Sequence, residues 1–401
     1  MRPGGGAAMM PTVSHPVRHP AYLRPGHRRG QTAVVLLAVA LVLAACSGGK
    51  DRTTSTTSTA TTQPTTTNTT TTAAPLPPST VAVPAGATIT QPDQSTSGPG
   101  SNAQPHRGWR ESSGGSGADA WFVFEPADPA PVSAPVVVIL HGYYEFSGYQ
   151  TMEGLIRHSV LGGSIVIYPR WQTDTAVPCP GPFDPEPCVQ SATTAIHDAL
   201  AFLRADPSRV QPEADHADYF GLSFGGILAT DLANRWQALD LPEPRTVFLD
   251  DPHDGGYDGK DEPAVDDDLS DIPSTALLVC HVGSQGVISE EGQADSSCNA
   301  FFNRLTSLPE SHKRLVLTFP DDHGRPGLTS HHGVCGTLGG SDAYDWGFCW
   351  RVWDAMRMAA DHGSDLTEVV PLPPGRLDVG AWSDGTPITS PTVTARAPVR
   401  P

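Results

Sequence analysis

Basic residues are scarce in this chain of 401 residues, which contains only three lysines. Its 25 lysines and arginines face 43 aspartates and glutamates, which leaves a formal net charge of −18. Contact with nucleic acid phosphates requires clustered basic side chains, so we expect no nucleic acid partner. Aromatic residues are also few, at 7%, but 38% of the chain is hydrophobic, mostly after residue 106, so a folded core is expected there.

No apolar run is long enough to span a bilayer. The run at residues 33–45 has 13 residues, whereas a membrane-spanning helix needs about 20. It follows an arginine pair and leads into the sequence Leu-Ala-Ala before Cys46, a pattern typical of a secretory signal peptide. The sequence around Cys46 also resembles the lipobox of bacterial lipoproteins. This resemblance implies lipidation of the Cys46 thiol and a lipid anchor at the extracellular face of the bacterial cell membrane, with ordinary secretory cleavage as the alternative.

Composition divides the chain into four parts. Residues 1–45 form the predicted signal peptide, and residues 46–105 form a predicted disordered stalk, in which 14 of the 25 residues at 51–75 are threonine. Residues 106–373 are the predicted folded domain, and residues 374–401 are a tail that contains one predicted ordered turn at residues 382–385.

Cysteines are few, and no C-x-x-C pair indicates a metal site. Six remain when Cys46 is set aside, and an even number in an exported chain indicates disulfides. Their clustering along the sequence favours the pairs Cys179–Cys188, Cys280–Cys298 and Cys335–Cys349.

Short β-branched runs alternate with helical patterns from residue 121 onward. This alternation is typical of an α/β fold, in which helices cover both faces of a mainly parallel sheet. Ligands bind at the carboxyl ends of the strands in such sheets, so residues that follow strands are the candidates for a functional site. Strands are predicted at residues 121–125, 136–140, 164–168, 218–222, 246–250, 275–281 and 314–319, and helices at residues 151–161, 191–205, 224–238, 294–305 and 344–360.

The strongest motif is Gly-Leu-Ser-Phe-Gly-Gly at residues 221–226, between a predicted strand and a predicted helix. It matches the G-x-S-x-G nucleophile elbow, whose glycines make room for a sharp turn, and it predicts Ser223 as a nucleophile. The sequence His-Gly-Tyr143 follows another predicted strand. The backbone N–H groups of Tyr143 and Phe224 are therefore the expected oxyanion donors, and the imidazole of His141 is interpreted as structural.

A nucleophilic serine needs a histidine base and a carboxylate, which in α/β-hydrolases follow it in the order acid, then histidine. Asp251 comes at the end of a predicted strand and is the preferred acid, with Glu290 as the alternative. His323 follows the last predicted strand and is the preferred base. The alternatives for the base are His331 and His332, in the same loop.

These motifs resemble the α/β-hydrolase superfamily over residues 118–362, and within it the chlorophyllase-like and cutinase-like branch. The resemblance implies an α/β-hydrolase fold. It also supports Asp251 through the Asp-Pro pair at 251–252 and His323 through Asp-His-Gly at 322–324. Two departures are that Leu222 stands where chlorophyllases usually have histidine, and that His323 is followed rather than preceded by glycine, so chlorophyll is not implied as a substrate.

The expected function is that of a serine esterase or lipase, which cleaves a small-molecule or polymeric ester through an acyl-enzyme, without metal or organic cofactor. A peptidase or acyltransferase on the same triad, or a non-catalytic surface binding protein, is the alternative. The acidic stretch at residues 250–271 lacks the register of a calcium loop, so calcium is not expected there. The aromatic residues expected near the strand ends, either as a pocket wall or as core, are Tyr143, Tyr144, Phe146, Tyr149, Trp171, Trp346 and Trp350.

Overall fold

A central β-sheet organises the part of the chain that the computed structural model describes, which is residues 88–143, 145–179, 184–252, 265–286 and 298–397. These ranges belong to one of the two units into which the chain divides, Ala74–Pro401. Within them, no helix has the length and apolar character needed to cross a membrane. The predicted signal peptide, Cys46 and the first part of the predicted stalk lie outside the described residues.

The sheet is parallel at its centre and antiparallel at both edges. Among the described residues its spatial order is β1-β2-β4-β3-β5-β6-β7-β8-β9. In this spatial order, the adjacent strands β4, β3, β5, β6, β7 and β8 are parallel to one another. The strands β1, β2 and β9 join the sheet through antiparallel pairs. The strands are β1 Gly108–Gly114, β2 Trp121–Ala127, β3 Ser133–Leu140, β4 Ile165–Pro169, β5 Gln211–Leu222, β6 Glu243–Asp250, β7 Leu277–Gly283, β8 Lys313–Thr318 and β9 Thr392–Thr394.

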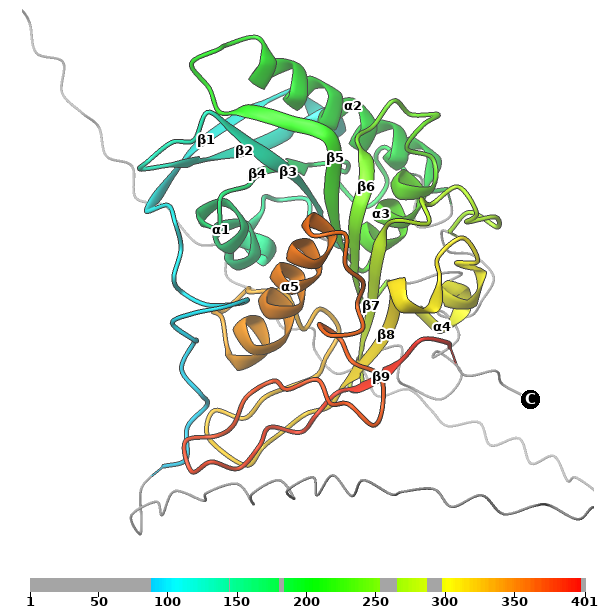
Figure 1. Cartoon of the computed structure of the whole chain (residues 1–401). Coiled ribbons are helices and arrows are strands. Elements are labelled where there is room, and N and C mark those ends of the chain that lie inside the picture. Colours follow the sequence, from blue (N-terminus) through cyan, green and yellow to red (C-terminus); the bar gives the residue numbers. More distant parts are fainter. Residues whose placement is uncertain (1–87, 144, 180–183, 253–264, 287–297, 398–401) are drawn as a thin grey trace, which may run out of the picture. The chain divides into compact units, whose positions relative to one another are not determined.

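Helices cover both faces of the sheet (Figure 1). The helices α1 and α5 lie on one face, and α2 and α3 lie on the other. Because strand side chains alternate between faces, Val138 packs in the core beside α2 and α3, while its neighbour Val137 packs in the core beneath α1 and α5. This arrangement confirms the predicted α/β-hydrolase class. The helices are α1 Glu153–Leu161, α2 Glu186–Arg204, α3 Phe224–Asn234, α4 Cys298–Phe301 and α5 Trp350–Asp361.

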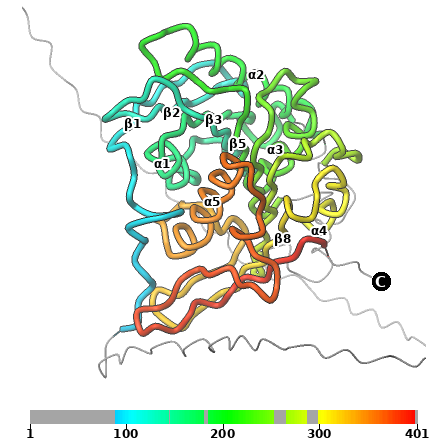
Figure 2. Tube along the Cα trace, in the orientation of Figure 1, coloured from blue at the N-terminus to red at the C-terminus, as the bar shows by residue number. Residues whose placement is uncertain are grey.

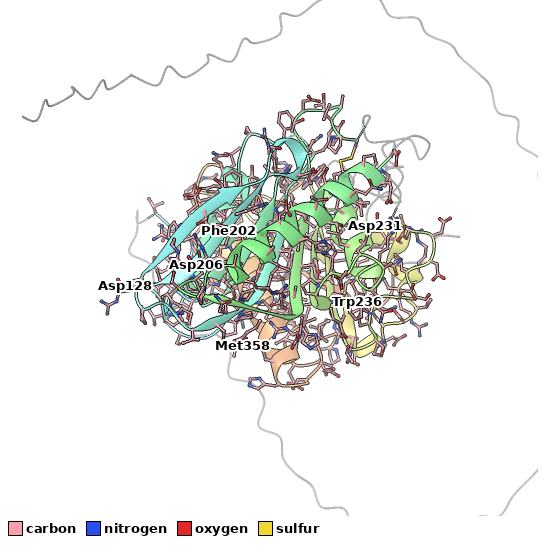
Figure 3. The ribbon with its side chains drawn as sticks, turned by 90° about the horizontal axis from the view of Figure 1, so that it is seen from above. Asp128, Phe202, Asp206, Asp231, Trp236 and Met358 are labelled. Carbon is pink, nitrogen blue, oxygen red and sulfur yellow. A yellow bond between two sulfur atoms is a disulfide. The ribbon has the colours of Figure 1, made fainter. Side chains whose placement is uncertain are left out.

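The parallel strands of the sheet all run in the same direction, so their carboxyl ends lie at one end of the sheet. Figure 3 views the molecule from the end at which they begin, where the labelled residues Asp128, Asp206 and Trp236 lie in the segments that lead into β3, β5 and β6. The carboxyl ends of these strands, where ligands bind in such sheets, therefore lie at the opposite end.

The seven predicted strands are all present, with shifted bounds, but β1 and β9 were not predicted from the sequence. The helix predicted at 294–305 is shorter: α4 ends at Phe301 and a 3-10 turn, Phe302–Arg304, follows it. The residues before α4, at 287–297, lie outside the described ranges. The helix predicted at 344–360 begins instead with a π-helical turn, Asp345–Cys349, which precedes α5.

A buried carboxylate fixes α5 to the sheet. Asp218 of β5 is fully buried and accepts hydrogen bonds from Arg245 Nε at 3.0 Å and from Arg357 Nε at 2.7 Å. Although burial opposes ionisation, the charges of Arg357 and Arg245 hold the pKa of Asp218 below its ordinary value. Since Arg357 lies on α5, this cluster positions the helix above the sheet.

Packing extends beyond both predicted domain boundaries. Figure 2 shows residues 88–106 running beside α5 and the C-terminal tail running beside the loop after β8. Gly100 donates its N–H to Asp354 of α5 at 2.8 Å, and Thr90 donates its N–H to Ser383 at 3.0 Å. The predicted stalk is thus too long by residues 88–105. The predicted tail is part of the domain through residue 397, since β9 pairs with β8.

The three predicted disulfides are confirmed. The Cα atoms are 5.6 Å apart in Cys179–Cys188, 5.9 Å in Cys280–Cys298 and 5.6 Å in Cys335–Cys349. The last pair joins the loop after β8 to the π-helical turn before α5, which holds that loop against the helix.

Candidate active site

Ser223 occupies a sharp turn between β5 and α3, with φ 55° and ψ −122°. Few residues other than glycine adopt such a positive φ, and those that do are concentrated at functional sites. Among the described residues other than glycine, Asp128, Trp171, Asp240 and Asp251 also have a positive φ. Of these, Asp251 directly follows β6, which pairs with β5, so two strained residues lie at adjacent strand ends. The Ser223 N–H donates to the carbonyl of Asp250 at 2.8 Å, which fixes the turn to β6.

The flanking glycines have no room for a side chain. A Cβ added to Gly221 would lie 2.2 Å from the carbonyl oxygen of Gly225. One added to Gly225 would lie 2.4 Å from the carbonyl oxygens of Leu140 and His141. The close approach between the elbow and the end of β3 therefore requires glycine, as the motif predicts.

The predicted oxyanion loop lies beside Ser223. A Cβ added to Gly142 would lie 3.5 Å from Ser223 Cβ. The ring of Tyr143 lies 5.7 Å from the ring of Phe224. Phe224 is the first residue of α3, so its N–H has no acceptor within the helix. Gly142 of the predicted oxyanion loop and Phe224 therefore both lie beside Ser223, and the role of the Tyr143 and Phe224 N–H groups as oxyanion donors stays a prediction.

His141 is fully buried below this loop. Its Nε2 lies 2.6 Å from the carbonyl oxygen of Arg170, and its ring stacks on Trp171 with centroids 4.5 Å apart. Burial lowers the pKa of His141 to about 4, so the imidazole is neutral. These contacts agree with its interpretation as a structural residue. Trp171, in turn, stacks on Phe224 with centroids 5.1 Å apart and belongs to the core.

Asp251 is fully buried directly after β6. It accepts the N–H of Gly283 at 3.0 Å and that of Gly333 at 3.3 Å. Its Oδ2 lies 3.7 Å from Nδ1 of His332, within ion-pair distance but longer than a hydrogen bond. Burial and the charge of neighbouring Asp250 raise the pKa of Asp251.

His332 lies next to the elbow. Its side chain is 30% exposed, and burial lowers its pKa, although the charge of Asp250 acts in the opposite direction. A Cβ added to the next residue, Gly333, would lie 3.2 Å from Leu222, which precedes Ser223. The structure therefore places His332, one of the two alternatives for the base, beside Asp251 and on a loop that reaches Leu222, the residue before Ser223.

The preferred base, His323, lies elsewhere. Its Nε2 lies 2.8 Å from Asp384, in the turn of the C-terminal tail, and this contact lowers the pKa of Asp384 to about 2. The reason is the path of the loop after β8. Asp321 and Leu328 exchange two backbone hydrogen bonds, so the chain doubles back and carries His323 toward the tail before it returns to the strand ends near Ser330.

The other candidates have separate positions. Nδ1 of His331 lies 3.2 Å from the carbonyl oxygen of Gln285, and no contact between His331 and Asp251 occurs within the described ranges. Glu290, Tyr144 and most of the acidic stretch at 250–271 lie outside the described residues. Tyr149 packs on Phe124 in the core beneath α1, with ring centroids 4.9 Å apart.

A second carboxylate–histidine pair was not predicted. Asp250 and His281 are fully buried neighbours on β6 and β7, with Oδ1 and Nδ1 2.7 Å apart. His281 Nε2 contacts Thr318, and Asp250 Oδ2 accepts the N–H of Cys335 at 3.0 Å. The available signal was a polar residue in each of two apolar strands. The Cys335 sulfur also lies near this pair, but its disulfide prevents it from acting as a thiolate metal ligand.

No family model and no curated protein matches the chain. Among solved structures, it is similar to esterase B from Lactobacillus rhamnosis, with 15% identity, a TM-score of 0.45, and coverage of 64% of this chain and 90% of that one. It is also similar to a structure from an analysis of two fungal esterases from Rhizomucor miehei, with 13% identity, a TM-score of 0.44, and coverage of 66% and 85%. Likenesses this distant assign no activity to the chain.

The elbow makes a specific prediction for Gly225. Replacing it by alanine places a methyl group against two backbone carbonyls, so we expect the Gly225→Ala variant to lose at least about 2 kcal/mol of unfolding free energy in urea titration. Gly108→Ala is the matched control, because a Cβ there meets nothing within 4 Å. Equal stability of the two variants would contradict the close approach between the elbow and β3.

Proposed function

We propose that the protein is a serine esterase or lipase. The observation that carries this proposal is the convergence of three segments at the strand ends: the elbow with Ser223, the end of β6 with Asp251, and the loop with His332. The geometry favours His332 over His323 as the base. Membership of the chlorophyllase-like and cutinase-like branch remains part of the proposal, supported by the Asp-Pro pair at 251–252 but no longer by His323.

The proposed mechanism is acyl transfer in two steps. His332 removes the proton from the Ser223 hydroxyl as its oxygen attacks the ester carbonyl, and the N–H groups of Tyr143 and Phe224 stabilise the negative charge on the carbonyl oxygen. The alcohol leaves with the proton from His332. Water, deprotonated by His332, then attacks the acyl-enzyme and releases the acid. Asp251 orients the imidazole and stabilises its positive charge; such contacts often tighten when substrate binds.

A fluorophosphonate probe and single substitutions test this assignment. We expect the probe to label the intact domain but not a Ser223→Ala variant, and the kcat/KM for p-nitrophenyl butyrate to fall at least about 10³-fold in Ser223→Ala and His332→Ala. His323→Ala is the matched control and should retain activity within about threefold, because its imidazole binds the tail.

Two outcomes would overturn the proposal. Absence of labelling at Ser223 in folded protein would remove the nucleophile. Loss of activity in His323→Ala, with activity retained in His332→Ala, would restore the base preferred from the sequence. Comparing the same acyl group as ester and as amide separates an esterase from a peptidase.

The pKa of His332 predicts the acid limb of the pH profile. A general base must be neutral, and burial lowers the pKa of His332 below its ordinary value of 6.5. We therefore expect kcat/KM to stay high as the pH falls to 6.5 and to decline only below it, in steady-state measurements between about pH 4 and pH 9. An acid limb centred above pH 6.5 would contradict His332 as a base whose pKa is lowered.

Lipid anchoring at Cys46 is also part of the proposal, and it is supported by the sequence alone. The Cys46→Ser variant lacks the thiol that would be acylated, so we expect it to leave the membrane fraction of a bacterial host, while Ser47→Ala remains there. Immunoblots of the fractions give the measurement. Persistence of Cys46→Ser in the membrane fraction would favour another form of attachment, and absence of the unaltered protein from that fraction would favour ordinary secretion.

A further inference from the structure

A cavity of about 670 Å³ lies between α1, the segment at residues 88–106 and the start of α5. This volume is within the range of small-molecule sites, about 300–1,000 Å³. None of the residues assigned to the mechanism lines it. Thr337, which does line it, belongs to the loop that carries His332, so the cavity begins a few residues from the proposed base.

The lining of the cavity combines polar side chains with flat aromatic rings. The lining includes Trp346 and Trp350, and because their indole nitrogens are buried, only other parts of the two rings are available to a ligand. Trp350 stacks on His158 with centroids 4.8 Å apart, which fixes its orientation. Carboxamide groups come from four residues of the lining: Gln94, Asn102, Gln104 and Gln150. The amide nitrogens of Gln94 and Gln104 already donate to the carbonyl oxygens of Gly100 and Ser101.

Two opposite charges lie at the exposed rim. Glu153 and Arg157 are one turn apart on α1 and both line the cavity, yet neither side chain forms an ion pair or hydrogen bond within the described ranges. An acyl chain would form no hydrogen bond with this polar lining, and a polyanion would face Glu153 and a chain of net charge −18. A ligand with many hydroxyl groups and apolar ring faces satisfies both the polar groups and the indoles.

The cavity is connected to the nucleophile by hydrogen bonds. Thr337 donates its N–H to the carbonyl of Thr151 at 2.7 Å, and the Thr151 side chain hydrogen-bonds Glu145. Glu145 Oε2 accepts the N–H of Gly142 at 3.0 Å, and Gly142 lies against Ser223. These hydrogen bonds therefore link the loop that contains Thr337 to the predicted oxyanion loop.

We propose that this cavity binds the carbohydrate portion of the substrate, so that the substrates are O-acylated saccharides. This inference rests on the proposed function and specifies its substrate class. In the reaction, the acyl carbon forms a bond to Ser223 Oγ as its bond to the saccharide oxygen breaks, and that oxygen takes the proton held by His332. Water then splits the acyl-enzyme into a carboxylic acid and Ser223.

Binding is tested first without catalysis. The Ser223→Ala protein is titrated with xylotetraose, cellotetraose, maltotetraose and chitotetraose at up to millimolar concentration, and tryptophan fluorescence reports binding. We expect saturable binding of at least one, and a loss of affinity of about tenfold or more when Trp346→Ala is added. Trp109→Ala is the matched control, because Trp109 lies on β1, is 38% exposed and does not line the cavity.

Kinetics then connects the cavity to the reaction. With the acetylated form of the bound tetrasaccharide and with p-nitrophenyl acetate, Trp346→Ala and Arg157→Ala should lower the ratio of the two kcat/KM values at least about tenfold, and Trp109→Ala should not. An unchanged ratio, or absence of binding to all four saccharides, overturns the inference. If Ser223→Ala binds a saccharide but the intact protein cleaves no ester, the proposed function fails and the carbohydrate site stands.

Discussion

The candidate site depends on two consecutive aspartates buried at the end of β6. Asp250 binds the elbow through its carbonyl, which accepts the Ser223 N–H, and binds the loop after β8 through its side chain, which accepts the Cys335 N–H. Asp251 accepts a second N–H from the same loop, at Gly333. Because a buried carboxylate without partners is very unfavourable, these contacts restrict the loop to a narrow range of positions. The nucleophile and the proposed base are thus held by the same two residues.

The elbow and the candidate acid of this site could be predicted from the sequence, whereas the candidate base could not be chosen among three histidines. The elbow at Ser223 needs only a strand, a turn and a helix that are adjacent in sequence, so its glycines identify it. The base depends on the path of a long loop. That path is set by the Asp321–Leu328 turn, by the contact between His323 and Asp384, and by a disulfide, all of which connect distant residues. His332 lies three residues before Cys335, whose predicted disulfide was the signal in the sequence that this part of the loop has a fixed position.

The same distinction applies to the fold. The central strands are buried on both faces and appear as short apolar runs, so their number and order along the chain could be predicted. Polar and small residues predominate in the edge strands β1 and β9 and in the segment at residues 88–105. On the basis of composition, residues 88–105 were predicted to belong to the stalk, and the residues of β9 to the tail. They are ordered by contacts to distant elements, such as the Gly100 N–H on Asp354 and the pairing of β9 with β8.

The segments that were difficult to predict from the sequence lie outside the central sheet, and several of them surround the cavity. Residues 88–106 and the loop after β8 form two sides of the 670 Å³ cavity, and the π-helical turn before α5 supplies Trp346 to its lining. That turn also contains Cys349, so the disulfide to Cys335 connects one wall of the cavity to the loop that carries His332. Rigid strands hold the reactive groups, whereas variable loops determine which substrate reaches them. Under the proposed function, the determinants of specificity therefore lie in residues whose positions are fixed by packing between distant parts of the sequence.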